Sequence, residues 1–402
     1  MSANDFVPEA GTRPQRIEYV RETTRGETPT DPEWNTYSDH IVSWWDWEPD
    51  ANKTAEQPAG DSDPDFTDAG SETHEASISY WLQKWLVDGS GNPQDAAADG
   101  MLLSDDNSYL NTHSVVSRMD ISSNGADGAG YRVYHVGKGG AVTEVTLPFE
   151  VDEGNPVQPE LSYQFEKFRT YRIDQPSAST TLDITNNGST SVDVTIEDEG
   201  AATTETITVS GGSSQTTVES FGDIDAVELS NDVDGSVEVS DGSGTTFITI
   251  EGSDSYTTEG DLGIPALGSG SHASTIDTDY VIFNDDTYQY STEEIAAEII
   301  SGELTVSLES DDNPRVGSAR RNINTTGRRT TWSATVAGES TSVNQVANYL
   351  TNTVYDIEWV ADEGTITGPD AEYFSPGSSD FEAGSGKNER SIELQSKGVT
   401  IS

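Results

Sequence analysis

Between residues 113 and 173, apolar and polar residues alternate in short runs. The runs read SVVSRMDIS, YRVYHVG, AVTEVTLPFEV, ELSYQF and RTYRI, and they are separated by the turn-forming residues Gly, Asn, Asp and Pro. A period of two is typical of β-strands that bury one face, because successive side chains of a strand point to opposite sides. We therefore predict strands here, and we interpret the GKGG sequence at 137–140 as a turn between two of them.

The same period continues through residues 177–260, where the strands are shorter and more evenly spaced. Seven candidate strands occur there, with turn sequences such as NNGS, SGGS and DGSG between them: TTLDIT, SVDVTIE, ETITVS, TTVESF, AVELS, SVEVS and TTFITIEG. Short strands that recur every roughly 8–12 residues are typical of an immunoglobulin-like β-sandwich. The segment contains neither Cys nor Trp, which excludes an antibody-type domain.

Helical periodicity is restricted to short segments. Residues 77–89 place Trp81 and Trp85 about one turn apart on an apolar stripe, and residues 291–300 and 341–350 show the same spacing. The stripe in 77–89 predicts a helix that faces the core. Alternatively, the two Trp side chains form a contact between subunits, since Trp is enriched at the energetic centres of interfaces.

Strand-like runs return in the C-terminal part with GELTVSLES, RTTWSATVAG, TVYDIEWVAD and RSIELQSKGVTIS. The predicted fold class is therefore mainly β with a few short helices, in which an immunoglobulin-like sandwich is inserted between two parts of one β-rich sandwich or barrel domain. The predicted segments are an N-terminal arm and first strand at 1–47, an acidic loop at 48–76, a first domain part at 77–176, the inserted sandwich at 177–262 and a second domain part at 263–402.

The charge of the chain changes this picture in one respect. The 402 residues include 72 acidic and 20 basic residues, which gives a net charge of −52. Such a charge with few apolar residues is compatible with disorder, but disordered chains are poor in aromatic residues. This chain contains 8 Trp, 15 Tyr and 10 Phe. We interpret the charge as adaptation to concentrated salt, because a Debye length of about 3 Å at 1 M removes most of the self-repulsion.

Composition also excludes several classes of protein. The absence of Cys excludes disulfides, thiolate catalysis and Cys-based metal centres. The N-terminal sequence MSANDFVPEAG lacks the basic and apolar regions of a secretory signal, and no run approaches the 18 or so apolar residues of a membrane span. An overall negative surface repels nucleic-acid backbones, so we expect no specific binding of nucleic acid.

Candidate chemistry is sparse. The chain has no GxSxG or GxxxxGK[ST] motif and no HxxxH pair among its 5 His, so we expect no catalytic residue and no cofactor. The one candidate metal site is the set Asp61, Asp63, Asp65 and Glu72, which has the spacing of a calcium loop but Phe66 in place of its Gly. A solvated loop is the alternative interpretation. A hydrolase that uses two carboxylates is a further class, which nothing in the sequence favours.

The basic residues have an uneven distribution, and none lies between Arg172 and Arg315. Because the surrounding charge is negative, we expect two arginine groups to pair with carboxylates of a neighbouring subunit rather than with nucleic acid. Bidentate pairs of this kind resist screening by salt when they are partly buried. One group lies in the N-terminal arm and the other in the sequence RVGSARRNINTTGRR: Arg13, Arg16, Arg21 and Arg25, and Arg315, Arg320, Arg321, Arg328 and Arg329.

Several segments resemble the major tail tube proteins of long-tailed, siphovirus-like viruses, in this case of a virus that infects haloarchaea. RIEYVRETTRGETPTDPEW is similar to the opening of these proteins, and FEKFRTYRIDQPS is similar to the strand that leaves their first half. A third segment resembles their succession of strand, acidic turn, arginine loop and returning strand, and it reads ELTVSLESDDNPRVGSARRNINTTGRRTTWSATVAG. The acidic loop 48–76 takes the position of the family's long loop between rings.

The resemblance implies a tail-tube-type β-domain without cofactor or catalytic residues. It implies copies that form closed rings, usually of six, which stack into a hollow tube for genome delivery. The expected partners are further copies, other tail proteins and passing double-stranded DNA that is not bound specifically, with no membrane. The expected location is the virion tail, after assembly in the host cytoplasm at high salt. The alternative is a baseplate or head-decoration protein whose inserted sandwich binds a glycan or protein of the host surface.

Overall fold

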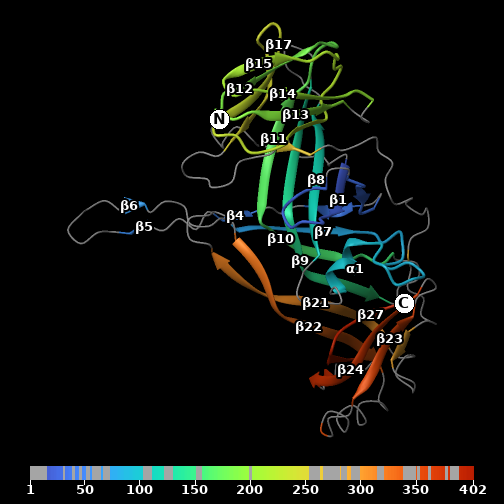
Figure 1. Cartoon of the computed structure of the whole chain (residues 1–402). Helices are drawn as coiled ribbons and strands as arrows, with labels where there is room; N and C mark the ends of the chain where they lie inside the picture. Colours follow the sequence, from blue (N-terminus) through green and yellow to red (C-terminus); the bar gives the residue numbers. More distant parts are fainter. Residues whose placement is uncertain are drawn as a thin grey trace.

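The protein is mainly β and elongated (Figure 1). Strands contain 64% of the described residues and helix contains 3%, so the predicted β-rich class is confirmed. The computed structural model describes residues 16–29, 32–38, 41–44, 48–50, 55–56, 65–66, 73–102, 111–121, 130–150, 156–198, 202–252, 263–265, 281, 288–290, 299–314, 321–337, 350, 354–360, 364–375, 379–380 and 389–402.

One long strand, β9 (Tyr131–Glu150), joins the two halves of the largest sheet. Its first half lies between β8 (Thr112–Ile121) and β11 (Lys167–Asp174). Its second half lies between β10 (Glu160–Phe165) and β21 (Ile299–Pro314). We call these two halves the upper sheet and the lower sheet, as they lie in Figure 1.

The GKGG sequence lies in the middle of β9, where the strand changes neighbours, so the prediction of a turn at 137–140 is wrong. The ring of Phe165 packs directly against Gly137 and Gly140, and a Cβ atom at either position would overlap ring carbons. Gly139 has a positive φ of 64°. These glycines allow a continuous strand to bend and an aromatic ring to approach its backbone closely. Sequence patterns do not distinguish this use of Gly from its use in a turn.

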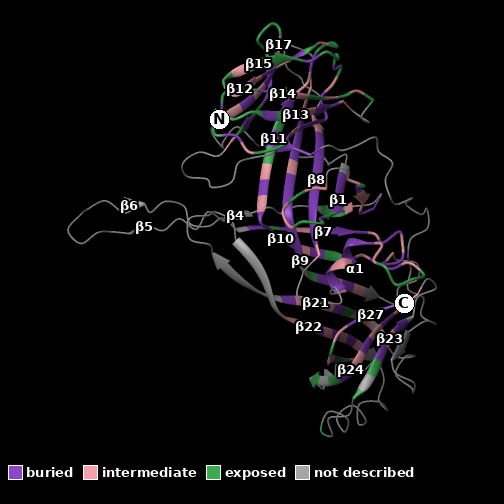
Figure 2. Cartoon of the chain, viewed as in Figure 1, coloured by how far each residue is buried: buried purple, intermediate pink, exposed green. Residues whose placement is uncertain are grey.

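Two strands of the upper sheet, β8 and much of β9, are buried on both faces, whereas Thr170 and Arg172 of β11 are exposed. β1 (Arg16–Arg21) pairs with β8 on one side and with β2 (Asn35–Thr36) on the other. Every described residue of β8 from Thr112 to Met119 is buried, and Figure 2 shows the same for much of β9. β8 is therefore covered on both of its faces.

The lower sheet continues from β9 in two directions. On one side follow β10, β7 and then β3 and β4, and on the other side follow β21, β22 and β26. Shorter strands extend the C-terminal edge, and β5 pairs with β6. The bounds are β3 (Ile41–Trp44), β4 (Glu48–Asp50), β5 (Ala55–Glu56), β6 (Asp65–Phe66), β7 (Thr73–Tyr80), β20 (Tyr288–Tyr290), β22 (Arg321–Ala337), β23 (Tyr355–Val360), β24 (Thr365–Ser375), β25 (Ser379–Asp380), β26 (Glu389–Ser396) and β27 (Thr400–Ile401).

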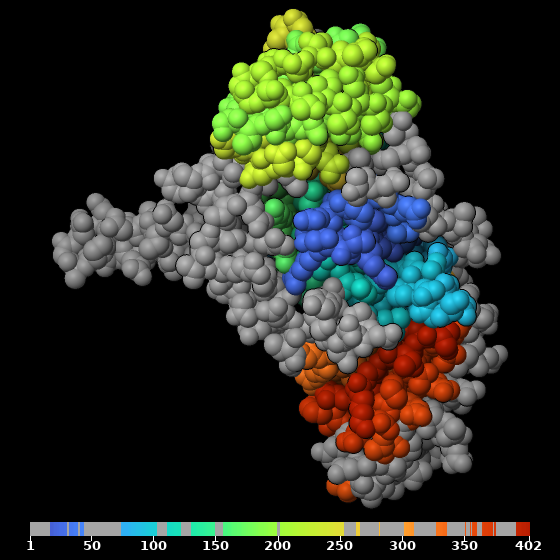
Figure 3. All heavy atoms as spheres, viewed as in Figure 1, coloured from blue at the N-terminus to red at the C-terminus, as the bar shows by residue number. Residues whose placement is uncertain are grey.

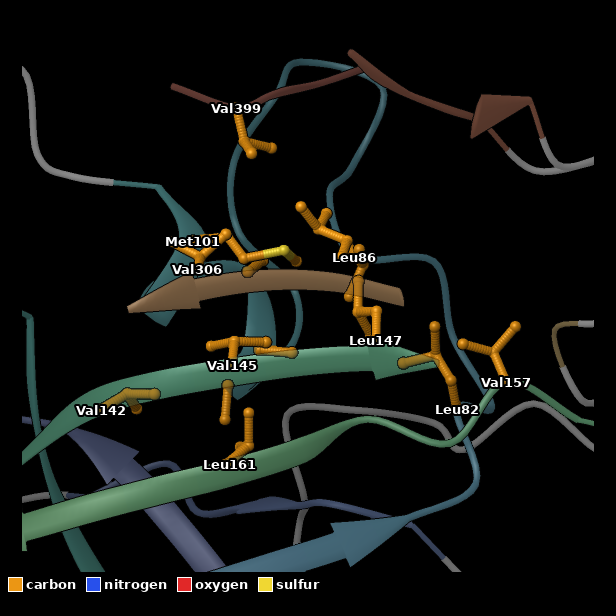
Figure 4. Packing of buried hydrophobic residues seen from close by; sticks show 14 of the residues in the cluster. Leu82, Leu86, Met101, Val142, Val145, Leu147, Val157, Leu161, Val306 and Val399 are labelled. Carbon is orange, nitrogen blue, oxygen red and sulfur yellow. The ribbon is translucent and has the colours of Figure 1, made fainter. Parts of the chain in front are cut away.

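One face of the lower sheet carries a large hydrophobic core (Figure 4). Strand residues such as Leu147 and Val306 contact Leu82 and Leu86 from the segment after β7 and Met101 from α1 (Ala96–Met101). Burial of each such side chain contributes about 1.5–3 kcal/mol. The core therefore fixes which face of the sheet is closed to solvent.

The prediction of a helix at 77–89 is wrong, because its first residues belong to β7 and the rest is irregular. Ile78 and Tyr80 point into the core from a strand, and Leu82 and Leu86 reach the same core from the irregular chain. The helical spacing of these apolar residues therefore indicates their burial in the core and does not indicate a helix. The helix α1 begins at the N-cap Asp95, and its Ala-rich sequence has no apolar stripe that would predict it.

The strands between Leu182 and Ile264 form two four-stranded antiparallel sheets, which we call the sandwich. The sandwich is the yellow-green part at one end of the molecule in Figure 3. Six of the seven predicted strands are present. TTVESF is not a strand, and β15 ends where it begins, while β19 pairs with β16 just beyond the predicted boundary at 262. One sheet contains β15 (Ser213–Thr216), β12 (Leu182–Asn186), β17 (Ser236–Asp241) and β18 (Thr246–Glu251), and the other contains β14 (Thr204–Val209), β13 (Val192–Glu197), β16 (Ala226–Leu229) and β19 (Gly263–Ile264).

The sandwich shares its hydrophobic core with the upper sheet. Val116, Tyr134, Val136 and Ile173 of β8, β9 and β11 belong to the same buried cluster as the interior of the sandwich. Part of the sandwich thus covers one face of the upper sheet. This continuity differs from an inserted domain that has a core of its own.

Three other predictions involve residues that the structure describes only in part. The predicted loop 48–76 contains β4, β5 and β6, and its last residues belong to β7. Of the predicted helix 291–300, residues 299–300 begin β21 and the others lie outside the described residues. Residues 341–349 of the third predicted helix also lie outside them. Among the described residues, no helix is long and apolar enough to cross a membrane.

Candidate functional site

The face of the lower sheet opposite the core is polar across six neighbouring strands, from β7 through β10, β9, β21 and β22 to β26. Residues on these strands lie directly opposite one another and form rows across the sheet. We call the residues of three rows the polar face: Ser79, Glu160, Thr146, Thr305, Thr331 and Gln395; Ser77, Ser162, Glu144, Ser307 and Arg329; and Pro148, Glu303, Ser333 and Glu393.

Strand alternation explains why this face is polar. Leu304 and Val306, which alternate with Thr305, are fully buried in the core, whereas Thr305 is partly accessible. The polar face contains hydroxyl groups, one amide and four glutamates, and its one cation is Arg329. An antiparallel sheet of this kind keeps one face on the core and the other in water.

Arg329 is bound within the chain. Its Nη2 and Nε atoms lie 2.6 and 3.1 Å from the side-chain oxygen of Gln395 when that amide is oriented to accept. Its guanidinium also lies over the ring of Phe374, 5.5 Å from the centroid. These contacts hold the one cation of the polar face in place on the sheet.

A buried ionic cluster joins the upper sheet to the sandwich. Oδ1 of Asp225, which lies just before β16, accepts hydrogen bonds from Arg118 Nη1 at 3.0 Å, Arg132 Nη1 at 3.2 Å and the Tyr134 hydroxyl at 2.5 Å. Asp120 adds a second carboxylate, 3.2 Å from Arg118 Nε. Burial and then the charge of Asp225 raise the pKa of Tyr134 well above its ordinary value, so the hydroxyl stays a donor. We call these groups the junction cluster.

Two of the predicted interface arginines form ion pairs within the chain. Arg21 pairs with Asp99 of α1, and Arg25 Nε lies 2.5 Å from Oε1 of Glu166. Glu166 is almost fully buried, and one third of Arg25 remains exposed. Arg21 therefore joins β1 to α1, and Arg25 joins the segment after β1 to the connection between β10 and β11.

A buried hydrogen-bond line continues from Asp99. His113 Nε2 lies 3.0 Å from Asp99 Oδ2, its Nδ1 lies 3.0 Å from the Tyr163 hydroxyl, and the Tyr37 hydroxyl donates to Tyr163 over 3.0 Å. Burial and then the charge of Arg21 lower the pKa of His113 to about 3, so the imidazole stays neutral. His113 is fully inaccessible, and the line therefore acts in packing rather than in chemistry on a substrate.

Glu22 completes this buried polar region. Its carboxylate accepts hydrogen bonds from the Gly26 and Gly139 amides at 2.7 and 2.9 Å and from the hydroxyls of Thr112 and Ser114 at 2.7 and 2.8 Å. Glu22 and Gly139 are far apart in sequence, so no local pattern could have indicated their contact. Sequence reasoning missed the whole region.

The structure places the other candidate residues as follows. Trp85 is buried in the core, where its Nε1 donates to the Ser402 carbonyl over 3.3 Å, and Trp81 is partly buried. Arg328 lies half-buried in β22. Arg16 and Arg321 are the first residues of β1 and β22, and their side chains lie outside the described part. Three further arginines lie outside the described residues, namely Arg13, Arg315 and Arg320.

The predicted arginine loop is in part a strand, because residues 321–329 belong to β22. The candidate calcium loop lies mostly outside the described residues: Asp61, Asp63 and Glu72 are not described, and Asp65 is known only as the first residue of β6. Within the part of the chain that the structure describes, no group of three or more His, Asp or Glu side chains is arranged to hold a metal ion.

Comparison with known proteins adds no assignment. No protein-family model matches the chain, and no curated protein is significantly similar to it in sequence. The function must therefore be argued from the polar face, the junction cluster and the long hairpin of β21 and β22.

Proposed function

We propose that this protein is the structural subunit of a hollow viral tail tube, in which copies form closed rings and the rings stack. It would act without catalysis, in the tail of a virion that is assembled in host cytoplasm at high salt. The observation that carries the proposal is the polar face, which crosses six strands without interruption.

The polar face supports the proposal because a sheet with one core face and one solvated face is suited to line a channel. Neighbouring copies in a ring would join their sheets into a barrel with the polar face inward. The sandwich lies away from the lower sheet, at the other end of β9 (Figure 1). We propose that it is an immunoglobulin-like domain on the outside of the tube.

The charges on the polar face also favour this role. Its four glutamates repel the phosphates of double-stranded DNA, and they outnumber its single arginine. DNA affinity rises with the number of phosphates that Lys and Arg neutralise. A wall with so few cations would let DNA pass without holding it.

Electron microscopy of the purified protein tests the proposal. In molar salt, negatively stained samples are expected to show rings or hollow tubes. A monodisperse monomer at every salt and protein concentration would contradict a tube, and it would favour a baseplate or head-decoration protein present in few copies.

The orientation of the polar face can be tested by thiol labelling, since the chain contains no Cys. Thr331→Cys places a thiol on the polar face, and Val218→Cys places one at an 85% exposed position of the sandwich. A bulky polymer maleimide should label both variants before assembly but only Val218→Cys in intact tubes. Equal labelling of both variants in tubes would contradict an inward polar face.

A further inference from the structure

The hairpin of β21 and β22 extends beyond the sheet that supports it. β21 pairs with β9 only as far as Ser307, and β22 pairs with β26 only from Thr330 onward. Beyond these points, residues 308–314 and 321–329 pair with each other and with no other described strand. We call this part the ribbon. An isolated two-stranded ribbon is marginally stable in water, so further contacts would stabilise it.

Arg328 lies at the base of the ribbon, opposite Leu308 and on the same side of β22 as the buried Thr330. Its Nε and Nη2 atoms are buried and have no hydrogen-bond partner in the described part of the chain. Oγ1 of Thr330 is also buried and has no hydrogen-bond partner in the described part of the chain. Thr330 lies two residues from Arg328 along β22, at a distance of roughly 7 Å. Burial lowers the pKa of Arg328 to about 10.

This arrangement contrasts with that of four other arginines. The chain has 72 acidic residues for 20 basic ones, and Arg21, Arg25, Arg118 and Arg132 all meet carboxylates within the chain. A guanidinium has five donors in a fixed fork that matches a carboxylate. A guanidinium charge that is largely buried without a carboxylate is unfavourable, and a carboxylate from outside could reach it because the Arg328 side chain stays partly accessible.

We propose that Arg328, at the base of the ribbon, receives a carboxylate from a second copy of this chain. The inference rests on the proposed function and names one contact between subunits. Charge complementarity identifies the occupant, because a second copy presents a surface with a large excess of acidic groups. The contact is partly desolvated, so it would persist in concentrated salt.

The test compares Arg328→Gln with Arg329→Gln, which removes the same charge one residue away from a guanidinium already bound by Gln395. In molar salt, sedimentation should show that Arg328→Gln needs about tenfold more protein for half-assembly, as expected for loss of one charged contact. Arg329→Gln should assemble close to wild type. Unassembled Arg328→Gln should melt at the same temperature as wild type or higher, because the substitution removes an unsatisfied buried charge.

Other outcomes separate this inference from the proposed function. If wild type forms tubes and Arg328→Gln forms them equally well, the inference is overturned and the proposed function stands. A lower melting temperature of unassembled Arg328→Gln would show that the arginine acts within the fold, which also overturns the inference. If wild type self-associates without forming rings or tubes and Arg328→Gln does not self-associate, the inference stands and the proposed function as a tail tube is contradicted.

Discussion

The junction cluster and the base of the ribbon both hold partly desolvated arginines, but they differ in what surrounds the guanidinium. Arg118 and Arg132 meet the buried carboxylate of Asp225, which comes from the sandwich and joins it to the upper sheet. Arg328 meets no carboxylate among the described residues. The chain has many acidic residues, so this difference depends on where each arginine lies and not on a shortage of carboxylates. It indicates that the arginines of the junction cluster find their carboxylates within one copy and that Arg328 of the ribbon does not.

Removal of the shared carboxylate should have the largest effect on stability. Asp225→Asn leaves two buried guanidinium groups with less compensating charge, so the free energy of unfolding should fall by about 3–5 kcal/mol, as for other buried pairs that lose one partner. Denaturant unfolding in molar salt measures this loss. A change below 1 kcal/mol would show that the junction cluster does not hold the sandwich to the sheet.

The junction cluster also shows where sequence reasoning ends. Arg118 and Asp225 are 107 residues apart, and nothing local distinguishes Asp225 from the other acidic residues. The strands of the sandwich were predictable, because alternation such as that of Val192, Val194 and Ile196 is local and each of these residues is buried.

The polar face was predictable only in part. Alternation in β21 and β22 predicts that Thr305 and Thr331 share a side with other polar residues, but their position opposite Thr146 and Gln395 depends on strand register. The predicted turn at 137–140 and helix at 77–89 were wrong because Phe165 needs glycines inside a strand and because an irregular chain can fill a core at helical spacing. Register and packing against distant residues decide these features.

Asp95 is the acidic counterpart of Arg328, because burial shifts the pKa of each towards the neutral form. Burial raises the pKa of Asp95 from 3.8 to about 6 although Tyr80 and the Ala97 amide donate to it. Between these values the folded state binds more protons than the unfolded state, so the Asp95 contribution to stability falls as pH rises from about 4 to about 6. Asparagine keeps the helix cap and cannot ionise.

We therefore expect Asp95→Asn to gain stability over wild type as pH rises from 4 to 6, by at most about 3 kcal/mol, with a constant difference above that range. His113 contributes the opposite slope, because its pKa of about 3 makes the unfolded state the better proton acceptor below pH 6.5. The charge of Asp95 raises the pKa of His113, so its removal keeps the folded imidazole neutral and leaves this slope nearly unchanged between pH 4 and 6. Unfolding measured at several pH values gives the difference. A difference that does not change with pH would mean that Asp95 titrates normally.

Asp174→Asn should have the smallest effect, and it is the matched control for Asp225→Asn. Asp174 Oδ1 accepts from Arg172 Nη2 at 2.7 Å, a shorter distance than either arginine contact of Asp225, but both side chains are more than 40% exposed. Exposed pairs contribute about 0–1 kcal/mol and are screened by salt. The free energy of unfolding should therefore change by less than 1 kcal/mol at low salt and by no measurable amount in molar salt, since water already solvates both charges. Equal losses for Asp174→Asn and Asp225→Asn in molar salt would contradict the view that burial, rather than contact distance, distinguishes the arginine sites of this protein.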